Sequence, residues 1–219
     1  SEVVKAMFSV VAGQGVYSVA LWSEWDSPET YNSILHVYKD NVSFFSTTFT
    51  PNEVFTNLTI SQDGSRMVTV ENTYLSSQIS GSKITIYMTG EVTIDVGAKS
   101  SEYFPIDGTE ITTEEIITGI TLSDDGQWLF VGTGSKCSAY DLNTSFTNFL
   151  TNDSYTWESV HQWDFTVQSL ACKNGTLVIG TGGGYTVKVY SGNTWKDHSS
   201  DSTVNTGHFV ALSENATKL

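Results

Sequence analysis

The feature that most constrains this chain is an internal repeat of roughly 50 residues. Four apolar runs each end on a tyrosine, and these tyrosines are separated by 49, 53 and 50 residues; they are Tyr38, Tyr87, Tyr140 and Tyr190. A fixed period of this length indicates one supersecondary unit that recurs along the chain. We therefore expect a fold built from similar units.

Each repeat also carries a short apolar run that meets a polar turn ending in a small residue. The turn segments are Leu58–Gly64, Ile120–Gly126, Leu170–Gly175 and Val210–Ala216. A second apolar run follows the turn and predicts the returning strand of a hairpin. The third run ends on the repeat tyrosine, and a weaker fourth run follows at Val42–Phe45, Glu91–Ile94 and Ser159–Phe165.

Four antiparallel strands in about 50 residues predict one blade of a β-propeller. The runs are dominated by Val, Ile, Thr, Tyr and Phe with a period of two, so the predicted fold class is all-β with almost no helix. We expect a single propeller domain or propeller segment. Its four full blades lie at about 14–54, 55–115, 116–165 and 166–204, with partial blades at 1–13 and 205–219.

Both ends of the sequence fall within a blade. Val3–Val10 predicts a fourth strand and Phe209–Leu212 predicts a first strand. Three explanations follow: an excerpt of a larger propeller, a four-bladed ring closed by its two ends, or an edge completed by another chain. We favour the excerpt, and we expect a processed product or part of a longer chain because the start, Ser1–Val4, is neither an initiator Met nor a basic-then-apolar leader.

One repeat resembles a known family. The segment Ile120–Gly134, with its Ser-Asp-Asp-Gly turn, followed by Cys137–Leu142 with its Tyr-Asp pair, is similar to a blade of the WD-repeat and YVTN-like β-propellers. The resemblance implies the fold. It implies no binding residue, because no Trp-Asp pair ends a third strand and the pairs at Trp25 and Trp163 fall elsewhere.

The charge balance excludes several kinds of partner. The 219 residues hold 24 acidic and 10 basic side chains, a formal net charge of −14, and Arg66 is the single arginine. Nucleic acids and anionic membranes, which are bound through Lys and Arg, are therefore not expected as partners, and phosphorylated ligands are disfavoured. The sequence has no run of 18 apolar residues, so membrane insertion is not predicted within this segment. The acidic stretch Glu102–Glu115 is expected to form a solvated loop between blades, with a partner contact as the alternative.

Six Asn-X-Ser/Thr sequons indicate N-linked glycans. They lie at Asn41, Asn57, Asn143, Asn152, Asn174 and Asn215. Four of them fall in predicted turns, which are exposed as glycan acceptors must be, although asparagine also favours turns for backbone reasons. We expect several of the six to be glycosylated, and hence a protein that is secreted and works outside the cell or at its surface.

The two cysteines, Cys137 and Cys172, allow one disulfide at most. They are predicted at the start of a third strand and at the end of a first strand in the next blade. Because a bridge needs α-carbons roughly 4.4 to 6.8 Å apart, two buried thiols are the favoured interpretation, and a disulfide is the alternative.

No pattern of residues supports catalysis, a metal or a cofactor. The four histidines show no metal spacing, and the Gly-X-Ser-X-Gly elbow of serine hydrolases does not occur. The run Gly180–Gly184 precedes a strand, so a hairpin connection is favoured over a phosphate loop. In the turns at Asp63 and Asp125 we expect the carboxylate to bond back to the chain, because two carboxylates are too few for calcium.

We therefore predict a non-catalytic module for interaction or structure, part of a larger glycosylated surface or filament-forming protein. Its partners are proteins or further copies of itself. The repeat tyrosines are expected to pack between blades, and the tryptophans predicted in or near loops are candidate contacts: Trp22, Trp25, Trp157 and Trp195. A secreted propeller hydrolase of the lactonase or glycosidase type is the first alternative, and an intracellular WD-repeat adaptor is the second.

Overall fold

The computed structural model describes sixteen strands and the segments beside them. The backbone is described for residues 3–12, 15–27, 30–39, 42–49, 53–75, 78–94, 98–143, 158–181, 186–199 and 210–213. Side chains are described for residues 55–72, 79–88, 113–143, 158–181, 187–197 and 210–213. All elements in this part of the chain are strands, apart from Leu142 and Asn143, which are helical. No helix among these residues is long and apolar enough to cross a membrane.

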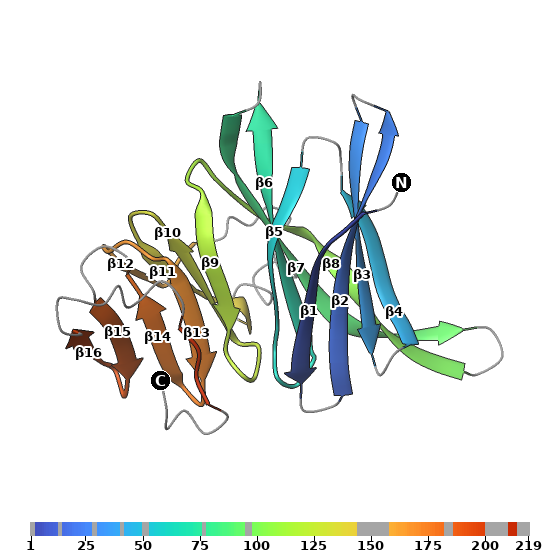
Figure 1. Cartoon of the computed structure of the whole chain (residues 1–219). Helices are drawn as coiled ribbons and strands as arrows, with labels where there is room; N and C mark the ends of the chain where they lie inside the picture. Colours follow the sequence, from blue (N-terminus) through green and yellow to red (C-terminus); the bar gives the residue numbers. More distant parts are fainter. Residues whose placement is uncertain are drawn as a thin grey trace. The chain divides into compact units, whose positions relative to one another are not determined.

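The strands form four antiparallel sheets of four strands, each a simple meander in which chain neighbours pair (Figure 1). Sheet A comprises β1 (Val3–Ala12), β2 (Gly15–Ser27), β3 (Thr30–Lys39) and β4 (Val42–Phe49). Sheet B comprises β5 (Glu53–Ile60), β6 (Arg66–Leu75), β7 (Gln78–Ile94) and β8 (Ala98–Thr113). This is the strand arrangement of a propeller blade.

Sheets C and D repeat the same order. Sheet C comprises β9 (Ile117–Leu122), β10 (Trp128–Thr133), β11 (Cys137–Asp141) and β12 (His161–Trp163). Sheet D comprises β13 (Ser169–Lys173), β14 (Thr176–Gly180), β15 (Thr186–Ser191) and β16 (Thr194–Ser199). The repeat tyrosines all lie on the third strand of their sheet, namely β3, β7, β11 and β15.

The chain divides into two compact units, residues 1–114 with sheets A and B, and residues 115–219 with sheets C and D. In the first unit, the described core gathers on the middle strands of sheet B, where Met67, Val68, Val70 and Ile84 are fully buried. The same strands bury a cross-strand ion pair, since Glu71 is 1% exposed and lies opposite Lys83 with Nζ to Oε2 at 3.0 Å. In the second unit, the core includes Leu129, Val167, Leu177 and Ile179.

Two hairpins of sheet D use the turn chemistry that their sequences predict. Asn174 and Gly175, between β13 and β14, have φ of 47° and 69°, while Gly192 and Asn193, between β15 and β16, have 57° and 62°. Two successive positive φ values match the twist of the flanking strands, and Asn and Gly tolerate them best. Both turns lie at the same end of sheet D.

Two predictions about sheet B are wrong. Glu91–Ile94 is not a fourth strand, because it continues β7 beyond Tyr87. The acidic stretch that begins at Glu102 is not a loop, since most of it belongs to β8, whose register with β7 runs from Ile94 opposite Ala98 to Ser82 opposite Thr113. Val and Thr within Glu91–Ile94 have high strand propensity. Three residues separate Ile94 from Ala98, where β8 begins as the antiparallel partner of β7.

The N-terminal strand also differs from the prediction. Val3–Ala12 is the first strand of sheet A, whereas the pattern predicts the last strand of a preceding blade. Ala12 lies opposite Gly15, so the short connection pairs β1 with β2 in one sheet. Of the predicted C-terminal strand, residues 210–212 are described and are not in a strand.

Candidate binding site between sheets C and D

The turn between the first two strands of sheet B is closed by its own side chains. Ser61 Oγ donates to Asp63 Oδ1 at 2.6 Å and accepts from the Arg66 N–H at 3.0 Å. The Ser65 N–H also donates to Asp63 Oδ1, at 2.9 Å. Gly64 has φ of 70°, which only glycine adopts easily.

Sheet C repeats this turn. Ser123 Oγ donates to Asp125 Oδ1 at 2.6 Å and accepts from the Trp128 N–H at 2.9 Å, while the Gln127 N–H donates to Asp125 Oδ1 at 3.0 Å. Gly126 has φ of 67°. The prediction that these aspartates bond back to their own turns is confirmed. In sheet C the turn places Ser123 and Trp128 at the end of the sheet where a cavity opens.

The register sets which side chains of sheets C and D meet. Neighbours in register share one face of a sheet. One face of sheet C presents the row Phe130, Ala139 and His161, and one face of sheet D presents the row Cys172, Leu177, Tyr190 and Trp195. Apart from the exposed His161, these rows belong to one apolar cluster, whose buried members are Phe130, Cys137, Ala139, Val167, Leu177 and Ile179. The two sheets therefore pack on each other through these faces.

Towards the edge strands β12 and β16, aromatic side chains form the contacts between sheets C and D. Trp128 stacks on His161 at a ring-centroid distance of 6.4 Å, and His161 stacks on Trp163 at 5.8 Å. Trp163 in turn contacts Tyr190 across the two sheets at 5.5 Å. Tyr190 thus packs between neighbouring sheets, as predicted for a repeat tyrosine. Trp195 contacts both Trp163 and Tyr190, at 5.2 and 4.9 Å.

A cavity of about 240 Å³ opens beside these rings. It is lined by Ser123, Trp128, Phe130, Ala139, His161, Trp163, Cys172, Gly175, Leu177, Tyr190 and Asn193. Among the residues that the structure describes, its lining contains no carboxylate or lysine. The turn residues Ser123, Gly175 and Asn193 place it at the end of the sheets where the β9–β10, β13–β14 and β15–β16 turns lie. We call it the aromatic cavity.

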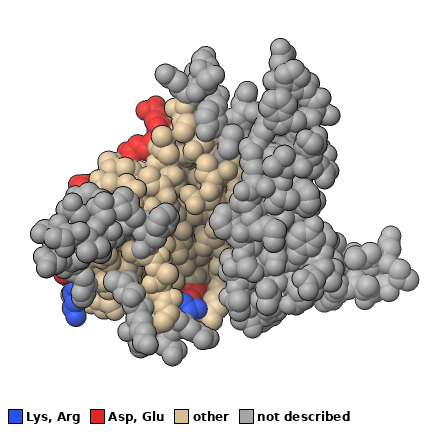
Figure 2. Space-filling model, viewed as in Figure 1, with Lys and Arg blue, Asp and Glu red and all other residues tan. Residues whose placement is uncertain are grey.

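The polar groups of the aromatic cavity are few. The Tyr190 hydroxyl donates to Asn193 Oδ1 at 3.3 Å, and Ser123 is engaged within its own turn. Asn193 and His161 are exposed, whereas Trp128, Trp163 and Tyr190 are half-buried. The site therefore offers mainly ring faces, with an amide at its rim. In the view of Figure 2, uncharged side chains cover most of the described surface, with most of the visible acidic ones along one margin.

The turns beside the cavity are tied together. Asp124 Oδ2 accepts a hydrogen bond from the Asn174 N–H at 2.8 Å, and Asp124 Oδ1 lies 3.2 Å from Lys173 Nζ. A turn of sheet C is thereby held against a turn of sheet D. This contact fixes the separation of the two sheets at the mouth of the aromatic cavity.

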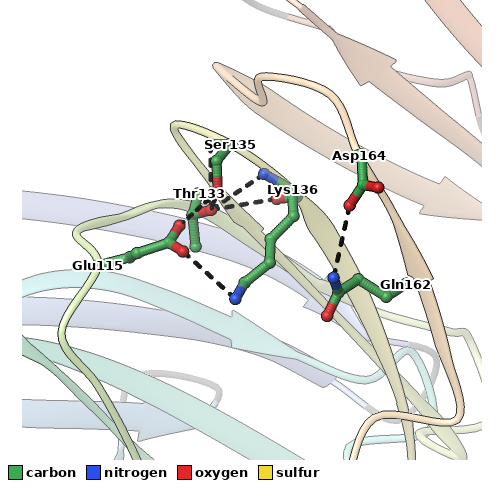
Figure 3. Close-up of polar contacts among 6 residues, drawn as sticks. All are labelled: Glu115, Thr133, Ser135, Lys136, Gln162 and Asp164. Carbon is green, nitrogen blue, oxygen red and sulfur yellow. Dashed lines mark hydrogen bonds and ion pairs between the residues drawn. The ribbon is translucent and has the colours of Figure 1, made fainter.

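The opposite end of sheet C has a separate polar cluster (Figure 3). Glu115 accepts from Ser135 Oγ at 2.8 Å and lies 3.3 Å from Lys136 Nζ. Hydrogen bonds from Thr133 and Ser135, together with Lys136, hold the pKa of the Glu115 carboxyl below its ordinary value. The cluster closes the β10–β11 connection. In sheet C, the segment Gly132–Ser135 lies at the β10–β11 connection. In sheet D, β14 and β15 pair as an antiparallel hairpin whose connection follows Gly180, as predicted; residues 182–185 lie outside the described part of the chain.

Both cysteines carry free thiols. Cys137 is buried in the cluster between the sheets, and Cys172 lies half-buried in the wall of the aromatic cavity. Burial raises the pKa of the Cys137 thiol to about 12. The pKa of the Cys172 thiol is also raised to about 12, mainly by burial and in part by the carboxylates of Asp124 and Asp125, against a smaller opposing effect of Lys173. The alternative of a Cys137–Cys172 disulfide is not what the structure shows.

The predicted glycosylation sites fall in different environments. Asn143 and Asn174 are exposed, and both lie at the end of sheets C and D where the aromatic cavity opens. Asn57 is half-buried on β5, beside an irregularity in its pairing with β6. Asn41, Asn152 and Asn215 lie outside the described residues.

Four tryptophans were predicted in or near loops as candidate contacts. Trp22 and Trp25 pair within β2 with residues of β3, and their side chains lie outside the described residues. Trp195 packs on the aromatic cluster because alternation along β16 places it on the inner face with Tyr190. Its Nε1 is buried and has no hydrogen-bond partner in the described part of the chain. Trp157 lies outside the described residues.

Of the residues that line the aromatic cavity, Trp128, His161 and Trp163 were not predicted as site residues, whereas Tyr190 was expected to pack between blades and Cys172 to be a buried thiol. The available signal was the spacing of two between Trp128 and Phe130 and between His161 and Trp163, which puts each pair on one face of a strand. The contact of these faces with Tyr190 could not be predicted, because it depends on how sheets C and D pack. Among the described residues, no three His, Cys, Asp or Glu side chains gather as metal ligands would.

Comparison with known proteins supports the fold alone. No family model matches the sequence, and no curated protein matches it. Among solved structures, the β-propeller domain of the Trilobed protease from Pyrococcus furiosus, which has an open velcro topology, matches with a TM-score of 0.52 at 10% identity, over 88% of this chain and 57% of that one. The chain is thus an all-β protein of β-propeller type.

Two further structures also match. Kuenenia stuttgartiensis hydrazine synthase matches at 11% identity and a TM-score of 0.48, over 87% of this chain and 57% of its own. KlAtg21, solved in complex with the coiled coil of AgAtg16, matches at 14% identity and a TM-score of 0.47, over 84% and 55%. The chain spans a little more than half the length of each of these structures.

Proposed function

We propose that this chain is a non-catalytic recognition module that captures a partner protein through the aromatic cavity. The observation that carries the proposal is the cavity itself, in which four aromatic side chains from two sheets surround an open space at the rim of the fold. Aromatic anchor pockets between rigid elements are where binding energy concentrates in protein interfaces. A partner's side chain is the natural occupant.

The size of the cavity favours a single group. Its volume of about 240 Å³ lies below the range of roughly 300 to 1,000 Å³ for pockets that enclose whole small molecules. One side chain of a partner segment fits such a space, and the rest of the segment would lie across the β9–β10 and β15–β16 turns. The rigid hairpins keep the loss of conformational freedom on binding small.

The hydrolase alternative is less well supported. Hydrolysis in a propeller would need ionisable groups converging on one cavity, whereas the aromatic cavity is walled by rings and apolar side chains. The pKa of about 12 for the Cys172 thiol also disfavours it as a nucleophile. We therefore retain recognition as the proposed role.

As part of the same proposal, the protein acts outside the cell or at its surface, as part of a larger glycosylated surface or filament-forming protein. The exposed positions of Asn143 and Asn174 suit glycan acceptors. Expression in a secreting eukaryotic cell, followed by peptide mass analysis with and without glycosidase, tests this part. Thr176→Ala should abolish the modification at Asn174 and Thr176→Ser should keep it, and unmodified Asn143 and Asn174 in the wild type would contradict the proposal.

A displayed peptide library selected on the folded chain tests recognition. Peptides that bind the wild type should bind at least about tenfold more weakly to Trp128→Leu, which removes one wall of the aromatic cavity. Ile116→Ser is the matched control, because Ile116 is 45% exposed and precedes β9 at the other end of the sheet. Selected peptides that bind the Trp128 variant as well as the wild type would refute the role of the cavity.

A further inference from the structure

The rings of the aromatic cavity form a continuous wall around it. Successive ring contacts run from Trp128 to His161, to Trp163 and to Tyr190, with centroid distances of 6.4, 5.8 and 5.5 Å. All four residues line the same cavity. The first two steps are nearly parallel, with interplanar angles of 24° and 26°, and the third is tilted by 51°. The wall therefore turns around the cavity as it passes from sheet C to sheet D.

Aromatic side chains that line one space favour one kind of group. The face of an aromatic ring carries partial negative charge, so a cation that enters such a space is attracted where it meets a ring face. An ammonium with methyl groups suits such a space better than a bare ammonium. Its charge is spread over apolar methyl groups that lose little hydration on burial, whereas an NH₃⁺ group needs hydrogen-bond acceptors.

The charges near the cavity favour a cation as well. Asp125 is exposed in the turn next to Ser123, and Asp141 lies opposite Trp128 in register, so it shares that face of sheet C. The nearby Lys173 is paired with Asp124. Lys188 on β15 is paired with Asp197, with Nζ to Oδ1 at 2.9 Å. The whole chain has a formal net charge of −14, which raises the local concentration of cations.

We propose that the aromatic cavity binds a methylated ammonium group, carried by a methylated lysine side chain of the partner protein. This inference rests on the proposed recognition function and names the chemistry of the group that is recognised. Tyr190 and Trp128 form the two ends of the wall, and the carboxylates of Asp125 and Asp141 lie outside the rings. A volume of about 240 Å³ leaves room for one such group.

The test compares two probes of the same shape and different charge. Choline carries a trimethylammonium group, and 3,3-dimethyl-1-butanol carries a neutral tert-butyl group in its place. Each is titrated into the folded chain at constant ionic strength, with sodium chloride replacing choline chloride in the control, and tryptophan fluorescence and NMR chemical shifts are followed. We expect saturable binding of choline that is about tenfold or more tighter than that of the neutral probe.

Variants locate the site and separate ring faces from other effects. Trp128→Leu keeps an apolar wall but removes a ring, so choline binding should fall at least about fivefold. Ile116→Ser should bind as the wild type does. Circular dichroism and thermal melting confirm that each variant is folded.

The outcomes distinguish this inference from the proposed function. Equal binding of both probes would overturn the assignment of a cation and leave an apolar anchor pocket. No binding of either probe would also overturn it, while the peptide selection above would still decide the recognition role. Preferential binding of choline that is unchanged in Trp128→Leu would place the cation elsewhere and refute the inference.

Discussion

The carboxylate of Asp124, in a turn of sheet C, accepts a hydrogen bond from the backbone N–H of Asn174, in a turn of sheet D, at 2.8 Å. The same carboxylate pairs with Lys173, the neighbour of Asn174. In the described part of the chain, the ladder hydrogen bonds join strands within each sheet, so side chains such as Asp124 help to hold one sheet against the next. We therefore expect this contact to contribute to the stability of the second unit and to the width of the aromatic cavity.

Replacing Asp124 by asparagine should weaken this connection. Asp124→Asn removes the ion pair with Lys173 and the charge on the hydrogen bond from Asn174, so the free energy of unfolding should fall by about 1 kcal/mol. Urea denaturation measures the change. Asp197→Asn is the control, since its pair with Lys188 lies within sheet D and the Asp197 side chain is 59% exposed, which predicts little effect. Equal effects of the two substitutions would contradict a special role for Asp124.

The turn at Asp63 should make stability depend on acid pH. Burial alone would raise the pKa of the Asp63 carboxyl, but hydrogen bonds from Ser61 and Ser65 and the charge of Arg66 outweigh it and lower the pKa from its ordinary 3.8. A lowered folded pKa means that the contribution to stability is present above the unfolded pKa and is lost as the pH falls through the folded value. Asp63→Asn should therefore destabilise at pH 7 and have less effect at about pH 2.

The measurement for Asp63 is denaturant unfolding of wild type and variant across this pH range. Asp197→Asn is again a suitable reference, because the Asp197 side chain is 59% exposed and its ion pair with Lys188 lies within sheet D. A difference between wild type and Asp63→Asn that stays constant from neutral to acid pH would show that the carboxylate charge does not matter.

Gly132 should tolerate no side chain. An added Cβ at Gly132 would collide with the Val167 side chain, which is fully buried in the cluster between sheets C and D. Gly132→Ala should destabilise by about 1 to 3 kcal/mol, the usual effect of overpacking. Gly134→Ala is a close control, because a Cβ at Gly134 meets nothing within 4 Å. Combining Gly132→Ala with Val167→Ala should recover part of the loss relative to the sum of the single changes, as thermal melting can show.

The two thiols should be unreactive in the folded protein. With pKa values raised to about 12, Cys137 and Cys172 form far less thiolate at pH 8 than an ordinary cysteine. We expect labelling by a disulfide reagent to be slower by a factor on the order of a thousand in the folded chain than after denaturation. Mass spectrometry of both states measures this. Fast labelling of the native protein, or an intact mass that lacks two hydrogens, would contradict buried free thiols.

Much of the fold follows from local sequence. The repeat tyrosines indicated the third strand of each sheet, and the Ser-X-Asp-Gly turns at Ser61 and Ser123 form the hydrogen bonds that their residue types dictate. These features are predictable because a turn or a strand alternation is decided by residues within a few positions of one another. The length of β7 was not predictable in the same way, since Glu91–Ile94 has strand character on either interpretation and only its pairing with β8 decides where it belongs.

The candidate site depended on contacts between sheets. An all-β chain of four-stranded repeats is predictable from the sequence, because the period, the turns and the alternation are local properties. The same pattern predicts Trp195 as an exposed contact, yet Trp195 packs beside Tyr190, while Trp128 and His161 line the aromatic cavity. These positions follow from the packing of sheets C and D, because which faces meet depends on contacts between residues some 30 to 60 positions apart in the chain, which no local pattern encodes.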